Sequence, residues 1–184
     1  MIQSKKAILY TTPALLMIFL FWLFEKNPFI FFIELFLGFI IGNSILELDH
    51  FVYWFVIDPK SQESQIAQKL IKHFNIDKLY HFYLQTKDFH QTLVFHHFYT
   101  QIALIIFSLF VLTSSNIITS RSLIFFTNLN LFIKQIFSFS HNKTQFQSWI
   151  FARMPRQILP DSLVYYLGIL AIFNFFFLVK MISL

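Results

Sequence analysis

The sequence predicts an all-α fold, a bundle of about five membrane-spanning helices with an amphipathic helical segment between the second and the third. Of the 184 residues, 57% are hydrophobic and only 12% are charged, whereas soluble domains carry about 25% charged residues. The apolar residues also gather into stretches of about 20, the length that a helix needs to cross a bilayer. The absence of cysteine excludes disulfide scaffolds, zinc ribbons and cysteine nucleophiles.

Five apolar stretches are the expected spans of a single membrane domain that covers residues 1–184. They lie at about 7–24, 28–50, 93–113, 117–138 and 162–182. The first begins with Lys5 and Lys6, as a secretory signal does. Its apolar run is long and no small-residue cleavage site follows it, so we expect an uncleaved anchor. The fourth stretch is the least apolar of the five.

Residues 58–92, between the second and third spans, are predicted to be helical. Apolar residues recur there every three or four positions, with glutamines and lysines between them, which is the pattern of an amphipathic helix. Ser61 before Gln62 and Glu63 fits a helix start. Two placements remain open: flat on the inner membrane surface with lysines toward anionic headgroups, or a helical hairpin packed against the bundle.

The distribution of basic residues predicts the orientation, because cytoplasmic loops carry an excess of Lys and Arg. Ten lie on the side of the N-terminus: Lys5, Lys6, Lys60, Lys69, Lys72, Lys78, Lys87, Lys143, Arg153 and Arg156. Three lie on the other side: Lys26, Arg121 and Lys180. We therefore expect a bacterial inner-membrane protein with its N-terminus inside and its C-terminus outside. The lipid bilayer is its expected partner, and no nucleic acid is expected, because the basic residues flank spans.

The second span carries a stripe of acidic and small residues. At 100° per residue, Glu34, Gly38, Gly42 and Asp49 fall within an arc of about 80°. Small residues let a second helix approach closely, and carboxylates within a span usually face the interior of a bundle. The stripe is therefore predicted to face another helix, with Asp49 pointing into the bundle.

A polar cluster is predicted at the inner side, where three spans begin or end. Asp49 and His50 close the second span, His96 and His97 open the third, and Asn130 and Lys134 lie in the inner half of the fourth. Carboxylate and imidazole groups are ligands for zinc or a related divalent ion. Adjacent residues such as Asp49 and His50 need a local irregularity of the helix to reach one ion. Helix capping and hydrogen-bonded packing are the alternative roles.

Three short motifs in this cluster resemble those of bacterial membrane-bound metal-dependent hydrolase-like proteins, a family with relatives described as LexA-binding inner-membrane hydrolase-like proteins. Glu47-Leu48-Asp49-His50 is similar to the D-x-D-H motif that ends a membrane helix in that family. Phe95-His96-His97 stands where the family has F-H-S. The stretch 129–135 stands where the family has L-H-x-x-x-D, but Asn130 replaces the His and Lys134 replaces the Asp.

The resemblance implies a hydrolase that acts on a lipid or another amphipathic substrate at the inner leaflet. Asp49, His50 and His96 would then hold a divalent metal, zinc or manganese, and Glu47 would be a ligand or the general base. Such a metal lowers the pKa of bound water toward neutrality. The degraded third motif favours the alternative, a non-catalytic and metal-free membrane protein with a structural or partner-binding role.

The third motif also changes the charge of the cluster. Replacing Asp by Lys adds two positive charges, as many as a divalent cation supplies. The ammonium of Lys134 is therefore predicted to neutralise Glu47 and Asp49 in place of a metal, with Asn130 and Lys134 forming a structural polar cluster. Snorkelling of Lys134 to the inner interface is the alternative.

Overall fold

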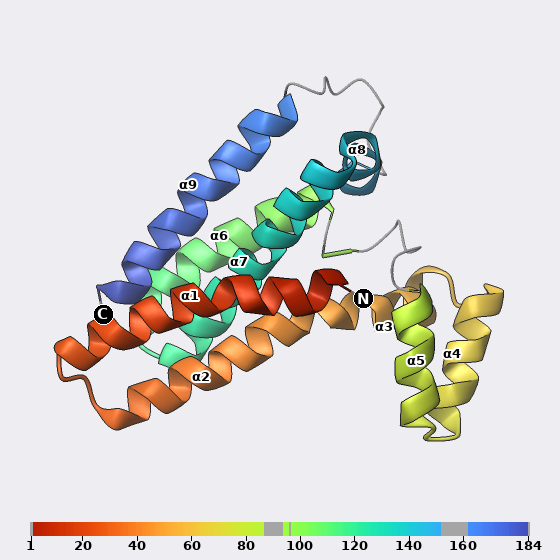
Figure 1. Cartoon of the computed structure of the whole chain (residues 1–184), viewed down its shortest axis with the longest axis horizontal. Coiled ribbons are helices and arrows are strands. Elements are labelled where there is room, and N and C mark those ends of the chain that lie inside the picture. Colours follow the sequence, from red (N-terminus) through yellow and green to blue (C-terminus); the bar gives the residue numbers. More distant parts are fainter. Residues whose placement is uncertain (1, 87–93, 96, 152–161, 184) are drawn as a thin grey trace.

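The computed structural model describes residues 2–86, 94, 95, 97–151 and 162–183, which are almost entirely helical and contain no strand. Five long helices form a bundle in which successive helices run in opposite directions (Figure 1). They are α1 (Ile2–Phe24), α2 (Phe29–Ser44), α6 (Phe98–Ser114), α7 (Ile118–His141) and α9 (Ser162–Ile182). The short helix α8 (Lys143–Ile150) follows α7. The all-α prediction is confirmed for the described part of the chain.

Three helical stretches are long and apolar enough to cross a membrane, judged by length and composition. They are Phe29–Ile57, Ile118–His141 and Ser162–Ile182. The first and third predicted spans also form helices, but their apolar parts are shorter, Ile8–Phe24 and Phe98–Ser114. The third helix begins at Phe98 rather than near residue 93, because the backbone of His97 is still extended.

The bundle buries polar side chains and exposes apolar ones. Ser108, Ser122 and Gln135 are completely buried. Phe110 and Ile172, in contrast, are 66% and 69% exposed on the outer faces of α6 and α9. A soluble surface rarely presents so much contiguous apolar area, so this arrangement suits lipid surroundings.

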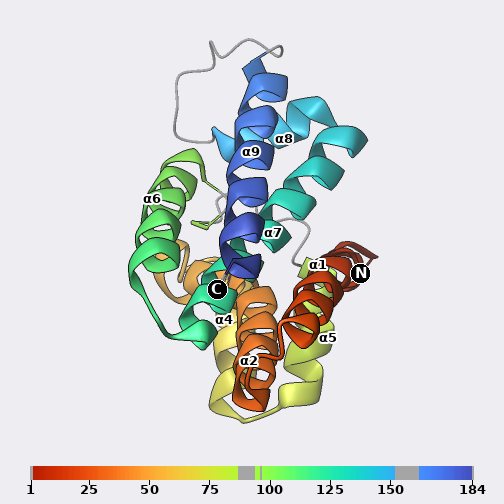
Figure 2. The same cartoon turned by 90° about the vertical axis from the view of Figure 1, so that its left-hand side faces the viewer.

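Helix α7 is the centre of the bundle and contacts α1, α2, α6 and α9 (Figure 2). In the most apolar 18-residue stretch of α7, half of the residues are buried inside the protein. The corresponding share is 33% in Phe29–Ile57 and 22% in Ser162–Ile182. Its less apolar composition follows from this position, because polar side chains inside a bundle can bond to neighbouring helices.

Three members of the predicted stripe, Glu34, Gly38 and Gly42, lie on α2 and face α7. A Cβ atom on Gly38 would lie 2.7 Å from the backbone nitrogen of Leu123, and one on Gly42 would lie 2.5 Å from the Leu123 carbonyl oxygen. Glu34 accepts hydrogen bonds from the backbone N–H (3.2 Å) and the hydroxyl (3.4 Å) of Thr119. The stripe therefore holds α2 and α7 together at backbone contact.

Residues 58–86 form a helical hairpin beyond the end of α2, with α4 (Gln62–Lys72) and α5 (Ile76–Thr86) antiparallel (Figure 1). Ser61 begins α4 as predicted, since its hydroxyl accepts the backbone N–H of Ser64 at 3.2 Å. The fully buried Trp54 attaches α4 to the preceding segment: its indole N–H donates to Glu63 at 3.0 Å, and its carbonyl accepts from Gln68 at 2.8 Å.

Candidate functional site

The segment with the predicted site residues departs from regular α-helix, as the adjacent Asp49 and His50 require. A 3₁₀ turn (Ile45–Glu47) follows α2, then α3 (Leu48–Val52), then a π turn (Tyr53–Ile57). Such turns often mark functional sites or local strain. They rotate successive side chains away from the regular helical positions, so that Glu47, Asp49 and His50 reach different partners.

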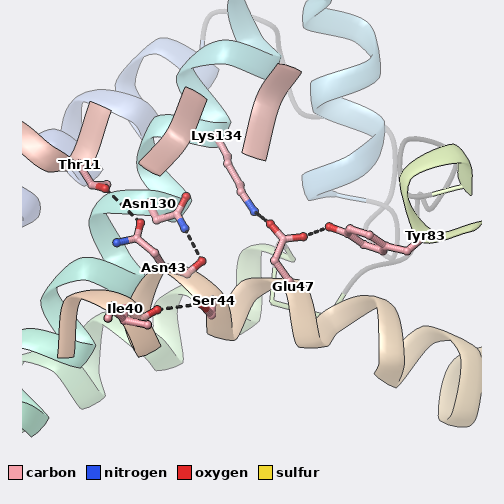
Figure 3. A network of polar contacts seen from close by, with 8 residues as sticks. All are labelled: Thr11, Ile40, Asn43, Ser44, Glu47, Tyr83, Asn130 and Lys134. Carbon is pink, nitrogen blue, oxygen red and sulfur yellow. Dashed lines mark hydrogen bonds and ion pairs between the residues drawn. The ribbon is translucent and has the colours of Figure 1, made fainter. Parts of the chain in front are cut away.

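Glu47 lies between a cation and a phenol (Figure 3). Its Oε1 is 2.9 Å from the Nζ atom of Lys134, and its Oε2 accepts a hydrogen bond from the hydroxyl of Tyr83. The Lys134 side chain is only 14% exposed, and that of Glu47 is 30% exposed. The predicted contact between Lys134 and Glu47 is therefore present in the structure.

Asp49 is held by the backbone that leads into α6. Its side chain is completely buried. Its Oδ1 accepts the N–H of Val94 at 2.9 Å, and its Oδ2 accepts the N–H of Phe95 at 2.8 Å. Asp49 is buried, as predicted for a residue that points into the bundle, and its two oxygens accept the N–H groups of two successive backbone positions.

His50 is 6% exposed and packs its ring edge-on against Tyr83, with ring centroids 5.0 Å apart. Tyr83 thus contacts both Glu47 and His50. His96, the third predicted ligand, lies outside the described residues. His97 is buried at the start of α6.

Asn130 lies one turn before Lys134 on α7 and joins that helix to α2 (Figure 3). Its side-chain N–H donates to the backbone carbonyl of Asn43 at 3.0 Å. The side chain of Asn43 in turn accepts from Thr11 of α1 at 3.1 Å. Asn130 therefore belongs to an interhelical network that connects three helices, consistent with the structural role predicted for it.

Sequence reasoning missed Tyr83, Asn43 and Thr11. Tyr83 lies in a segment whose placement relative to the bundle was open, so no pattern could assign it to Glu47. Asn43 carries a usable signal, because it directly follows Gly42 within an apolar span, where polar residues ordinarily bond across helices. The backbone donors of Val94 and Phe95 have no signal in the sequence.

Among the described residues, which leave out His96, no three or more His, Cys, Asp or Glu side chains are placed together to hold an ion. The ammonium of Lys134 places a positive charge 2.9 Å from Glu47. Both oxygens of Asp49 are turned to backbone N–H groups.

The arrangement is a charge-compensated polar junction among α2, α5, α7 and the start of α6. Comparisons of the chain with protein-family models, with curated proteins and with solved structures find no match.

Proposed function

We propose that this chain is an integral membrane protein whose inner polar cluster is a structural junction, and that the protein is non-catalytic and metal-free. The ion pair between Lys134 and Glu47 carries this proposal. In it, a lysine supplies the positive charge that a metal would otherwise bring. The junction fixes α5 and the start of α6 against the bundle, through Tyr83 and Asp49 respectively.

The membrane assignment in this proposal is five spans, with the N-terminus inside. Five antiparallel helices with buried polar and exposed apolar side chains support it, and the two chain ends lie at opposite ends of the bundle (Figure 1). The excess of Lys and Arg on the N-terminal side supports the orientation. The junction and the hairpin then lie at the cytoplasmic face of a bacterial inner membrane.

A metal-dependent hydrolase is the second candidate, favoured by the burial of Asp49 and His50 beside Glu47. In this alternative His96 completes the ligand set and Glu47 is the general base, acting on a lipid or amphipathic substrate. The alternative requires Glu47 to exchange Lys134 for the metal or its water.

A double-mutant cycle on the ion pair, run beside a metal analysis, separates the two candidates. Lys134→Met leaves Glu47 as an uncompensated, partly buried charge, and Glu47→Gln does the same to Lys134. The charges are 2.9 Å apart, which corresponds to about 6 kcal/mol at an effective dielectric constant of about 20. Desolvation and partial exposure offset much of this attraction, so we expect a coupling energy of about 1–3 kcal/mol.

The assay is thermal melting of the detergent-purified protein, with Lys60→Met as the matched control because Lys60 is exposed. Each single variant should melt lower, and the double variant should recover part of the loss. Elemental analysis should find no stoichiometric zinc or manganese in the folded parent. Stoichiometric metal that is lost in His96→Ala, or a neutral Lys134→Met, would overturn the proposal and favour the hydrolase.

A further inference from the structure

The turn between α4 and α5 holds an aromatic residue in a backbone conformation that favours glycine. Phe74 has φ of 51°. It follows the end of α4, where the N–H of Asn75 donates to the Leu70 carbonyl at 3.0 Å and the N–H of Phe74 donates to the Ile71 carbonyl at 2.9 Å. This is the Schellman pattern, in which the left-handed position is usually Gly. A bulky residue there is a genuine outlier.

Asn75 tolerates the left-handed conformation better than Phe74 does, but it has another role. Its side chain accepts the backbone N–H of Lys78 at 3.4 Å, and its carbonyl accepts the N–H of Leu79 at 3.0 Å. Asn75 therefore caps the start of α5. The left-handed backbone conformation falls on the preceding residue, Phe74. Strain that packing does not explain is a reason to look for a function.

Packing within the protein does not explain Phe74, because its side chain is 87% exposed. Ile76 is 72% exposed and Tyr80, one turn further along α5, is 52% exposed. We refer to Phe74, Ile76 and Tyr80 as the hairpin tip. Large apolar side chains gathered at a projecting turn are unfavourable in water, so the tip needs a partner that removes them from it.

The charges around the hairpin tip specify the chemistry of that partner. Lys69, Lys72 and Lys78 are exposed near the turn, together with a single acidic residue, Asp77. Apolar and aromatic side chains beside a basic face are typical of segments that lie in the interface of an anionic membrane. The three lysines outnumber the one acidic residue near the turn, so this part of the hairpin is positively charged and complements an anionic leaflet.

The position of the hairpin brings it to such a leaflet. The hairpin starts a few residues after Ile57, where the apolar stretch Phe29–Ile57 ends. In Figure 1, α4 and α5 run across the direction of α2. If α2 crosses the membrane, as in the proposed function on which this step rests, the hairpin runs along the membrane surface.

We propose that the α4–α5 hairpin is a membrane-surface anchor for anionic lipid. Phe74, Ile76 and Tyr80 insert into the interfacial region of the inner leaflet, and the lysines beside them contact headgroup phosphates. The strained conformation of Phe74 is retained because it directs the aromatic ring outward from the turn.

The experiment uses the full chain in phosphatidylcholine vesicles with and without phosphatidylglycerol. Because the sequence contains no cysteine, single variants carry one environment-sensitive fluorophore each. Ile76→Cys reports on the hairpin tip with Phe74 intact. Gln65→Cys, at an exposed position on α4, is the aqueous control, and Ile172→Cys, on the exposed face of α9, is the control inside the bilayer.

We expect quenching by spin-labelled lipid at positions 172 and 76, and quenching by aqueous iodide at position 65. Removing phosphatidylglycerol, or introducing Lys72→Gln and Lys78→Gln, should shift position 76 toward iodide quenching, by about fivefold in the docking equilibrium for each lysine removed. Phe74→Gly in the Ile76→Cys background should also undock the tip without lowering the melting temperature, because glycine relieves the backbone strain.

Each outcome has one meaning. Lipid quenching at position 172 with iodide quenching at position 76 would overturn the anchor and leave the membrane assignment standing. Protection of position 76 from both quenchers would also overturn the anchor, and would indicate that the tip is buried against a second copy of the chain. Iodide quenching at position 172 would overturn the membrane assignment itself. A Phe74→Gly variant that stays docked would show that the ring is not the inserting group.

Discussion

The two glycines that bring α2 against α7 allow a sharp test of the bundle, because a third glycine is a matched control. We consider Gly38→Ala and Gly42→Ala beside Gly168→Ala. An added Cβ at position 38 or 42 meets backbone atoms of Leu123 at 2.7 and 2.5 Å. At position 168 it meets nothing within 4 Å.

The expected magnitudes follow from two opposed effects. Replacing Gly by Ala inside a helix is favourable by roughly 0.5–1 kcal/mol. Overpacking ordinarily destabilises by about 1–3 kcal/mol, and contacts below 3 Å with backbone atoms belong at the upper end, since backbone cannot rotate away. We expect a net loss of about 2 kcal/mol for Gly38→Ala and Gly42→Ala, and a small gain for Gly168→Ala.

Thermal melting in detergent measures the difference. A loss of about 2 kcal/mol corresponds to roughly 4–8 °C for a chain of this length. Removing the hydroxyl of Ser122 should not rescue Gly38→Ala, because the Leu123 nitrogen still blocks the Cβ. Equal melting temperatures for all three alanine variants would refute the close contact between α2 and α7.

Two further predictions concern the polar junction. Asp49→Ala should destabilise the protein by about 2–3 kcal/mol, because it leaves the N–H groups of Val94 and Phe95 without their charged acceptor. Asp49→Asn retains one acceptor oxygen and should lose about half of that in the same melting assay; equal losses would contradict the two-bond geometry. Tyr83→Phe removes one donor to Glu47 and should cost about 1 kcal/mol. Amide hydrogen exchange should then rise in α5 while α7 keeps its protection, and unchanged exchange in α5 would show that the hydroxyl does not hold the hairpin.

The sequence predicted the helices and the face of α2 that another helix contacts, because both depend on local patterns. Apolar stretches predict helix positions, and the spacing of Gly38 and Gly42 identifies the face that another helix can approach. Lys134 was accessible to the same reasoning, since a lysine in the inner half of a span needs a counter-charge on that side.

The remaining contacts of the site depend on tertiary placement. Tyr83 reaches Glu47 only because the hairpin folds back beside the end of α2. The sequence of residues 58–92 alone left open whether this segment lies on the membrane surface or packs against the bundle. Asp49 binds backbone N–H groups, which every residue has and no sequence pattern distinguishes. The resemblance to metal-dependent hydrolases drew attention to Glu47, Asp49 and Lys134, but the backbone partners of Asp49 are visible only in the structure.

The contacts of Asp49 also make the hairpin a separable insertion. One carboxylate holds the N–H groups of residues 94 and 95, so the chain that passes through the α4–α5 hairpin comes back to residue 49 before α6 begins. The entropy of closing such a loop grows only slowly with its length. The hairpin can therefore become longer or shorter, or be replaced, without moving α2 and α6 relative to each other. The surface formed by the hairpin can then change in sequence while the bundle stays the same.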